Sequence, residues 1–377
     1  MFGVRYCPHR YAPEVRIALV CPYSLTVPGG VQGQVLGLAR ALRTLGHDAR
    51  VLGPCDGPPP EVGVIPLGNS IPTAANGSMA PIAPDPSCAL RTIAVLRDEH
   101  FDVLHLHEPL APGPTVTSVA WASAPLVGTF HASGVSAAYR VLRPLTRWLA
   151  RRLTFRCAVS EAARAMAERA LGGEYVVLNN GIEVERFTKA TPWPTEGPTV
   201  LFVSRHESRK GLDVLLAAMS GLPADARLWV ASDGPETSRL TALTEGDRRI
   251  EWLGRIGDGE RAARLRGADV LCAPSLRGES FGMVLLEGMA AQTPVVASDI
   301  PGYRNVAEGG GCGQAALLVP PGDPVALAAA LRGILYEPST RPALVAAGEA
   351  RANEFSMDHL AERYVDLYAR AIAIHDR

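Results

Sequence analysis

The sequence is poor in aromatic residues and has no excess of either charge. Aromatic side chains make up 6% of the 377 residues and hydrophobic residues 47%, so we expect cores packed mainly from Ala, Val and Leu, as in sheets covered by helices. Lys and Arg total 37 and Asp and Glu 38, which leaves a net charge of -1. A chain with this balance has no global electrostatic attraction to nucleic acid, so we expect no nucleic-acid partner.

The sequence also lacks paired cysteines and long apolar runs. Its seven cysteines are scattered, with no Cys-x-x-Cys, which favours the reduced thiols of a cytoplasmic protein over a disulfide framework or a zinc site. No apolar run is long enough to span a bilayer. Residues 1–15 contain two prolines but no apolar segment of a signal peptide, so we expect a disordered arm there.

Short apolar runs alternate with helical patterns twice along the chain, as in parallel sheets that helices cover on both faces. The chain is long enough for two domains. The sequence therefore predicts an α/β fold of two Rossmann-like, doubly wound parallel-sheet domains that face a cleft. Strands are predicted at 16–21, 49–53, 101–107, 126–130, 199–203, 227–231, 269–273 and 294–297, and helices at 31–45 and 211–219.

Residues 188–198 separate the two halves and contain three prolines and a glycine, a composition typical of linkers. We place the N-terminal domain at 16–190 and the C-terminal domain at 198–356. The last helix, predicted over 357–374, starts after the second sheet ends, and residues 357–377 are expected to pack back on the first domain. Ligands of such sheets bind at the carboxyl ends of the strands.

Gly29 and Gly30 lie between the first strand and its helix. Glycine lets backbone N–H groups approach a ligand closely, and a helix N-terminus favours a phosphate. A tight turn without a ligand is the competing interpretation. A nicotinamide site is disfavoured, because residues 29–33 are not Gly-x-Gly-x-x-Gly and the second strand does not end in an acid.

Arg205, Arg209 and Lys210 follow the first strand of the second half and precede a helix. Cations at the carboxyl end of a strand suit a diphosphate, whose charge must be neutralised as it leaves. A solvated basic loop is the alternative.

Residues 278–287 follow the strand predicted at 269–273. Glu279 precedes the helix, where it could meet sugar hydroxyls. Glu287 lies about two helical turns later and is expected on a similar face, where it could accept both hydroxyls of a ribose. Backbone N–H groups at the helix start predict an anion site formed by Phe281, Gly282, Met283 and Val284.

The same segment also matches Gly-x-Ser-x-Gly, the nucleophile elbow of serine hydrolases. Asp299 and His359 follow Ser280 in the order of a catalytic triad. An elbow places its serine directly at the end of a strand, whereas residues 274–277 intervene here. We therefore disfavour a hydrolase.

His131 lies just past the strand at 126–130, where it could hydrogen-bond a sugar at the reacting centre; a structural role is the alternative. His105, His107 and Glu108 could suggest a metal, and alternate spacing puts both histidines on one face of their strand. No further ligand of metal type is evident. We interpret them as structural or cleft-lining and expect no metal.

A basic amphipathic pattern covers residues 140–156. No acidic residue occurs between His131 and Ser160, and Leu145, Trp148 and Leu149 belong to its apolar face. Such a helix can lie on an anionic membrane, although a solvated face over a packed stripe is the alternative. Contact with the inner face of the cell membrane is predicted for Arg140, Arg143, Arg147 and Arg151.

Together these stretches resemble the GT-B glycosyltransferases of family GT4 and, more closely, the group of actinobacterial phosphatidyl-myo-inositol mannosyltransferases. The resemblance covers nearly the whole chain beyond residue 15. The Glu-x7-Glu pattern is typical of the GT4-like fold. The matching stretches are Val-Cys-Pro-Tyr-Ser at 20–24, Val-Pro-Gly-Gly-Val-Gln at 27–32, residues 101–109, Thr-Phe-His at 129–131, Arg-Lys-Gly at 209–211 and residues 278–287.

The resemblance implies a retaining transferase that moves mannose from GDP-mannose to a lipid such as phosphatidyl-myo-inositol, with no cofactor and no metal bound by the protein. The N-terminal domain would serve the acceptor and the C-terminal domain the nucleotide sugar. The attacking hydroxyl would lose its proton to the departing phosphate on the same face. By analogy, Arg205 and Lys210 hold the diphosphate, Glu287 the ribose, Glu279 and His131 the sugar, and Gly30 the phosphates, while Tyr23 and Gln32 contact the acceptor.

The sequence departs from the group's pattern on the acceptor side. Thr26 stands where an acid is expected, Leu110 where an Asn often follows, and residues 79–83 lack the expected basic residues. A Lys shortly after 129–131 is also missing. A phosphate-bearing acceptor without cations is poorly held, so we hypothesise a familiar donor site with a changed acceptor.

Two other activities stay open. One is a GT4 transferase that uses another nucleotide sugar and a different lipid-linked or small-molecule acceptor. The other is a sugar-nucleotide epimerase of the GT-B fold, against which the pair Glu279 and Glu287, together with His131, counts.

Overall fold

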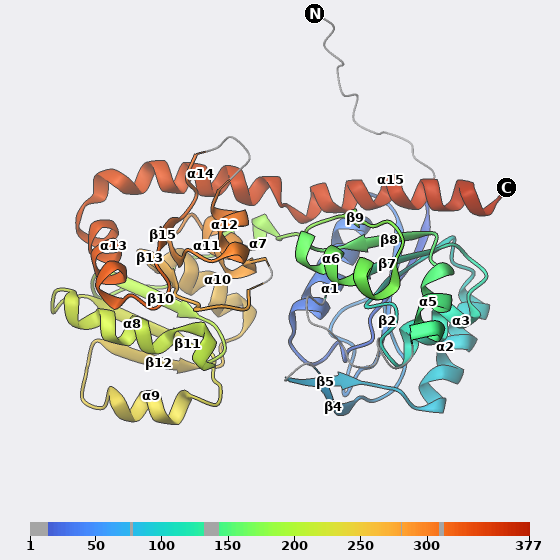
Figure 1. Ribbon diagram of the computed structural model, residues 1–377, viewed down its shortest axis with the longest axis horizontal. Coiled ribbons are helices and arrows are strands. Elements are labelled where there is room, and N and C mark those ends of the chain that lie inside the picture. Colours follow the sequence, from blue (N-terminus) through green and yellow to red (C-terminus); the bar gives the residue numbers. More distant parts are fainter. Residues whose placement is uncertain (1–13, 76–77, 132–142, 280, 309–312) are drawn as a thin grey trace, which may run out of the picture. The chain divides into compact units, whose positions relative to one another are not determined.

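The computed structural model of the protein describes residues 14–75, 78–131, 143–279, 281–308 and 313–377 (Figure 1). The chain divides into two compact units. The first comprises residues up to Asn179 together with Ala361–Arg377, and the second comprises Asn180–Leu360.

The described strands of the first unit form a parallel sheet in the order β3-β2-β1-β6-β7-β8-β9, beside an antiparallel hairpin, β4-β5. The strands are β1 (Arg16–Val20), β2 (Asp48–Gly53), β3 (Val64–Pro66), β4 (Ile71–Ala75), β5 (Ser78–Ile82), β6 (Val103–His107), β7 (Leu126–Phe130), β8 (Phe155–Ala158) and β9 (Val176–Val177). The helices are α1 (Gly30–Thr44), α2 (Pro86–Glu99), α3 (Pro114–Trp121), α5 (Arg143–Arg151), α6 (Glu161–Leu171) and, from Ala361 on, α15 (Met357–His375).

The second unit contains a parallel sheet in the order β12-β11-β10-β13-β14-β15. The strands are β10 (Thr199–Val203), β11 (Arg227–Ala231), β12 (Ile250–Gly254), β13 (Val270–Ala273), β14 (Val295–Ser298) and β15 (Leu317–Val319). The helices are α7 (Val184–Thr188), α8 (Leu212–Ala218), α9 (Thr237–Leu243), α10 (Asp258–Gly267), α11 (Met283–Ala290), α12 (Pro301–Ala307), α13 (Pro324–Tyr336) and α14 (Arg341–Glu354), with short 3-10 turns at Ser208–Lys210, Met219–Gly221 and Pro338–Thr340.

Both sheets are covered on two faces, as the apolar runs predict. In β10, Leu201 packs into one buried cluster, whereas Val200 and Phe202 pack into another. A strand buried on both sides needs apolar residues at every position, which explains why its sequence does not alternate with polar residues. The prediction of two doubly wound parallel sheets is confirmed.

Each sheet reverses its strand order beside its first strand, and this reversal marks where ligands bind in such folds. In the first unit β1 lies between β2 and β6, and in the second β10 lies between β11 and β13. The loops after β1, β6, β10 and β13 therefore frame the candidate sites.

The chain passes between the units at Asn179–Asn180, before the proline-rich stretch at 188–198. Phe187 is buried in the core of the second unit. Trp193 is anchored there as well, because the Arg264 guanidinium lies 4.3 Å from the Trp193 ring centre and the Trp193 backbone N–H donates to the Ala263 carbonyl. Trp193, within the proline-rich stretch, is thus held by α10.

Candidate functional site

The loop after β1 leads directly into α1, which begins at Gly30 and has no side-chain cap. A Cβ on Gly29 would lie 2.4 Å from Oε1 of Gln32, whereas a Cβ on Gly30 would meet open space. The uncapped first turn therefore leaves its N–H groups without a side-chain acceptor at a position where a ligand could approach.

The two residues predicted to contact the acceptor lie beside this loop. Gln32 is buried, and its Nε2 donates to the carbonyls of Ser24 (3.3 Å) and Val27 (3.1 Å). Tyr23 is partly buried and pairs with Ile82 of β5 through an isolated bridge. The Gln32 amide thus holds the loop after β1 through its backbone carbonyls. Of the two residues, only Tyr23 has a partly exposed side chain.

His131 follows β7 and is held by two residues at the end of β6. Its backbone N–H donates to Oε1 of Glu108 at 2.8 Å, and its Nε2 lies 2.9 Å from Nδ1 of His107. Burial lowers the pKa of His131 to about 4. The imidazole is therefore neutral near pH 7. Its second ring nitrogen can make one hydrogen bond with a ligand.

Both ring nitrogens of His105 have hydrogen-bond partners. Its Nδ1 lies 2.7 Å from the Tyr368 hydroxyl, and its Nε2 lies 2.7 Å from Oγ1 of Thr129. Within the described ranges, no group of three or more His, Cys, Asp or Glu side chains is arranged to hold a metal ion.

The loops after β10 and β13 are joined in the second unit. The backbone of Gly211 is left-handed (φ 68°), and a Cβ there would lie 2.0 Å from the Pro274 carbonyl oxygen. The Leu276 N–H also donates to the Arg209 carbonyl at 2.8 Å. Glycine is therefore required at 211 for the basic loop to reach the segment after β13.

This contact brings the predicted cations to Glu279. Lys210 pairs with its Oε1, and Arg209 Nη1 lies 3.4 Å from the same oxygen. Lys210 and Glu279 each expose only 14% of their side chains. Arg205 instead lies 3.4 Å from Glu207 and is more than half exposed, so it is the most accessible of the three predicted cations.

Two residues that the sequence did not indicate support Glu279. The hydroxyl of Ser275 donates to Glu279 Oε1 (3.2 Å) and lies 2.8 Å from the hydroxyl of Tyr303. Gly302 lies so close that a Cβ would sit 2.1 Å from the Glu279 carbonyl oxygen. Ser275 could have been suspected from its place after β13, but Tyr303 lies in α12 and carries no local signal.

Helix α11 begins at Met283, after Gly282 in a left-handed conformation (φ 90°) and without a side-chain cap. Met283 and Val284 thus lie in its first turn, as predicted for an anion site. The Phe281 ring is buried against Phe355, so only the backbone of Phe281 is available to a ligand. Ser280, the serine of the hydrolase hypothesis, lies outside the described residues.

Glu279 precedes α11, which starts at Met283 and contains Glu287. Glu287 pairs with Arg261 of α10, a partner that the sequence did not indicate. Burial raises the pKa of Glu287, while Arg261 and Arg186 oppose the rise. The two carboxylates thus have separate sets of basic partners.

The remaining triad candidates have other partners. Asp299 pairs with Arg304, and Nδ1 of His359 lies 3.0 Å from the Asn353 carbonyl. Neither contact is that of a catalytic triad.

Helix α5 (Arg143–Arg151) covers part of the predicted membrane helix. Arg140 and the side chain of Arg143 lie outside the described residues, while Arg147 is partly buried and Arg151 exposed. In α5, Leu145 and Trp148 expose about half of their surface, at 51% and 53%. Among the described helices none is long and apolar enough to cross a membrane.

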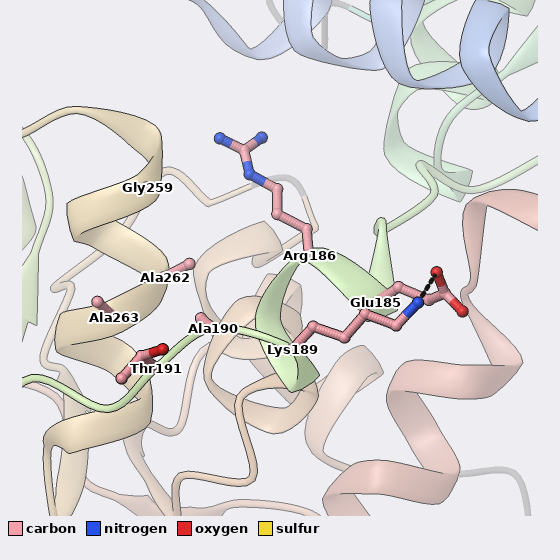
Figure 2. Close-up of a pocket in the computed structure, with 8 residues that line it drawn as sticks. All are labelled: Glu185, Arg186, Lys189, Ala190, Thr191, Gly259, Ala262 and Ala263. Carbon is pink, nitrogen blue, oxygen red and sulfur yellow. Dashed lines mark hydrogen bonds and ion pairs between the residues drawn. The ribbon is translucent and has the colours of Figure 1, made fainter.

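An open pocket of about 590 Å³ lies between α7 and α10. Figure 2 shows Lys189 paired with Glu185 on one side and Arg186 pointing away from this pair. Arg186 also pairs with Asp258 at 2.6 Å. The lining contains none of the predicted donor residues, so this pocket is not the site predicted from the sequence.

Comparison with known proteins finds two family models that together cover most of the chain. Residues 28–186 match the model described as Glycosyltransferase Family 4, and residues 197–337 match Glycosyl transferases group 1.

Among curated proteins, the chain is 40% identical to a phosphatidyl-myo-inositol mannosyltransferase of Mycobacterium leprae, with 94% of this chain and 96% of the relative covered. It is 38% identical to the protein of that name from Mycolicibacterium smegmatis, with 94% and 93% covered. Among solved structures, HepE of Anabaena with UDP and glucose has a TM-score of 0.71 at 20% identity, covering 95% of this chain and 100% of that one. This likeness shows a shared fold.

Proposed function

Because this chain belongs to glycosyltransferase family 4 and has the GT-B fold, we propose that it transfers mannose from GDP-mannose to an inositol phospholipid, with retention of configuration. The observation that carries the proposal is the 40% identity, over nearly all of both chains, to a relative named for this reaction. The departures at Thr26 and Leu110 lie on the acceptor side, so the test below varies the acceptor.

The contacts around Glu279 support a nucleotide-sugar site in the second unit. Arg205, Arg209 and Lys210 carry three positive charges, and the carboxylates that pair with them, Glu207 and Glu279, carry two negative ones. A diphosphate added to this loop would meet a net positive charge at the end of β10. In the proposal, Lys210 and Arg205 hold the diphosphate, and the backbone N–H groups of residues 281–284 approach its oxygens.

The carboxylates have separate tasks in this proposal. Glu279, held by Lys210 and Ser275, accepts hydrogen bonds from hydroxyls of the sugar. Glu287 accepts hydrogen bonds from the ribose hydroxyls, and its ion pair with Arg261 opposes the rise in its pKa that burial causes. His131 contacts the sugar and Gly30 the phosphates. The departing phosphate takes the proton of the attacking hydroxyl, so no protein base is required.

The test is a transfer assay with labelled GDP-mannose and vesicles that contain phosphatidylinositol. We expect a labelled lipid and one GDP released per sugar transferred. Removing one electrostatic contact to a transition state commonly costs about 100-fold in rate, so Lys210→Met should lower kcat by about that factor. Lys189 is the only other lysine of the chain and lies exposed beside Glu185, so Lys189→Met is the matched control.

Varying the donor and the acceptor in this assay distinguishes the proposed reaction from each alternative. Transfer from UDP-glucose but not from GDP-mannose would overturn the proposed donor. Transfer to another lipid but not to phosphatidylinositol would establish the changed acceptor. Conversion of the nucleotide sugar in the absence of any acceptor would instead indicate an epimerase.

We further propose that α5 docks on an anionic lipid surface. Trp148 and Leu145 are exposed beside Arg151, and the guanidinium of Arg152 lies 5.9 Å from the Trp148 ring centre. Exposed apolar groups flanked by arginines suit the boundary of an anionic membrane. Trp148→Ser should weaken sedimentation with anionic vesicles, while Leu243→Ser, which changes an exposed leucine of α9, should not. Equal binding by the two variants would contradict this docking surface.

A further inference from the structure

Three imidazoles lie together at the carboxyl ends of β6 and β7. The rings of His105 and His107, which share one face of β6, have centres 4.3 Å apart, and those of His107 and His131 are 5.2 Å apart and stacked. His105 and His107 are buried, and His131 is partly exposed. Of the three rings, His131 is therefore the one that a ligand can reach.

The nitrogens of these rings differ in their partners. Both nitrogens of His105 have partners, in Tyr368 and Thr129. Nδ1 of His107 lies 2.9 Å from Nε2 of His131. Nε2 of His107 is buried without a hydrogen-bond partner among the described residues. Within the described part of the chain, the contact with His131 is thus the one hydrogen bond of the His107 ring.

Burial keeps these rings neutral. It lowers the pKa of His131 to about 4, and the pKa of His107 falls well below its ordinary value for the same reason. A neutral imidazole carries one N–H. The 2.9 Å contact therefore has a donor on one ring and an acceptor on the other, and two arrangements are possible.

The two arrangements differ in what they leave buried. If His131 donates through Nε2–H, then His107 must keep its own proton on Nε2, where an N–H group is buried without a partner in the described part of the chain. If His107 donates through Nδ1–H, its Nε2 carries only a lone pair. A buried orphan N–H is the rarer and costlier of the two, so the second arrangement is favoured.

We propose that His107 is a positioning residue, whose Nδ1–H fixes His131 as the Nδ1–H tautomer, so that His131 presents a donor rather than an acceptor to the sugar. This inference rests on the proposed role of His131 at the sugar. It adds that His131 cannot act as a base through Nε2, because that nitrogen already accepts from His107.

The backbone supports the same assignment. Glu108 has a left-handed backbone (φ 50°), which is unusual for a residue with a side chain, and its carboxylate accepts the His131 N–H at 2.8 Å. Consecutive residues at the end of β6 therefore hold the backbone and the ring of His131. A ring fixed at both points needs no rearrangement when a ligand arrives.

The first experiment observes the tautomer directly in the full-length protein. With 15N-labelled histidine, we expect the His131 signals, assigned by loss in His131→Ala, to show protonated Nδ1 and unprotonated Nε2 at neutral pH. A proton on Nε2 of His131 would overturn the inference. This measurement needs no substrate, so it stands even if transfer from GDP-mannose fails.

The second experiment tests the positioning role by transfer kinetics. His107→Asn places an amide near the position of Nδ1 and should keep activity within a few-fold, whereas His107→Leu removes the donor. Misplaced catalytic groups cost up to about 100-fold, so we expect His107→Leu to lower kcat more than it raises KM. Combining it with His131→Ala should add little further loss.

Equal activity of His107→Asn and His107→Leu, with both variants folded by circular dichroism, would overturn the positioning role. Full additivity with His131→Ala would do the same. If no variant and no wild-type protein transfers mannose, the proposed function fails, and the tautomer measurement alone decides the contact between the two histidines.

Discussion

Three glycines at the start of α1 differ in what surrounds them. A methyl group on Gly29 would collide with Gln32, whereas one on Gly30 or Gly33 would meet no atom within 4 Å. Gly30→Ala should therefore leave the free energy of unfolding within about 1 kcal/mol of the wild type. If Gly30 approaches a phosphate, the same methyl should weaken GDP binding by at least about 10-fold. Calorimetric titration with GDP measures this loss.

Gly33→Ala is the matched control, because Gly33 lies one turn later on the same helix and also has open space around it. It should leave GDP affinity unchanged. Equal affinity of both variants and the wild type would contradict a phosphate contact at Gly30, and a large loss of stability in Gly30→Ala would show that the position is structural.

At the scale of elements, strands buried on both faces were the easiest to predict. The strands at 126–130, 199–203 and 227–231 have the predicted bounds, because burial on both sides demands an unbroken apolar run. The hairpin β4-β5 was missed, since Pro72 and Pro81 interrupt its pattern and proline is atypical of strands. Strand β12 was missed because it lies at the edge of its sheet and exposes Glu251.

The candidate site was predictable in its residues but not in its contacts. The sequence placed Lys210 and Glu279 after two strands of the second half and gave each a ligand role, but their ion pair appears only in the structure. The partner of Glu287 could not be predicted, because Arg261 comes from a helix 26 residues away in sequence. Similarly, nothing near Tyr303 indicated that α12 supports the segment after β13.

Helix α12 is expected to influence activity through one hydroxyl. Burial raises the pKa of Tyr303, so its hydroxyl stays protonated and donates to Ser275, whose own proton is then free for Glu279. Tyr303→Phe removes one hydrogen bond of about 1 kcal/mol and should lower kcat by several-fold without unfolding the second unit. Steady-state transfer kinetics measure the effect.

Tyr336→Phe provides the comparison. Its hydroxyl lies 2.8 Å from Asp225 on the surface of the same unit, and its loss should leave kcat unchanged. If the two variants behave alike, α12 has no special role in placing Glu279.

At the scale of the whole molecule, the histidine cluster should make the first unit sensitive to acid. The pKa of His105 is lowered to about 3 and that of His131 to about 4. When the pH falls below about 6.5, the ordinary pKa of histidine, these histidines take up protons in the unfolded chain but not in the folded unit. Stability is therefore complete above about pH 6.5 and falls as the pH drops toward 4, by about 1.4 kcal/mol per pH unit for each such histidine.

Urea unfolding of the first unit, followed by hydrogen exchange of β6 and β7 at pH 7, 6 and 5, measures this slope. His105→Gln cannot take up the proton and should remove about one histidine's share of the slope. An unchanged slope in this variant would show that another group causes the acid sensitivity.

Helix α15 should stabilise the first unit although it follows the second unit in sequence. Tyr364 and Tyr368 are buried there, where Tyr364 lies 2.9 Å from Thr129 Oγ1 and Tyr368 2.7 Å from His105. Removing a large buried aromatic side chain costs about 3–5 kcal/mol, and a domain is stable by only about 5–15 kcal/mol. Truncation after Leu360 should therefore unfold the first unit.

Hydrogen exchange resolves this outcome by element. Strands β6 and β7 should lose protection in the truncated chain, while β10 and β13 should keep it, because the second unit comprises Asn180–Leu360 and loses none of its residues. Truncation after His375 removes only exposed residues and should change neither unit. Loss of protection in both sheets would mean that the second unit also depends on residues after Leu360, and retention in both would mean that the tyrosine contacts add little to the first.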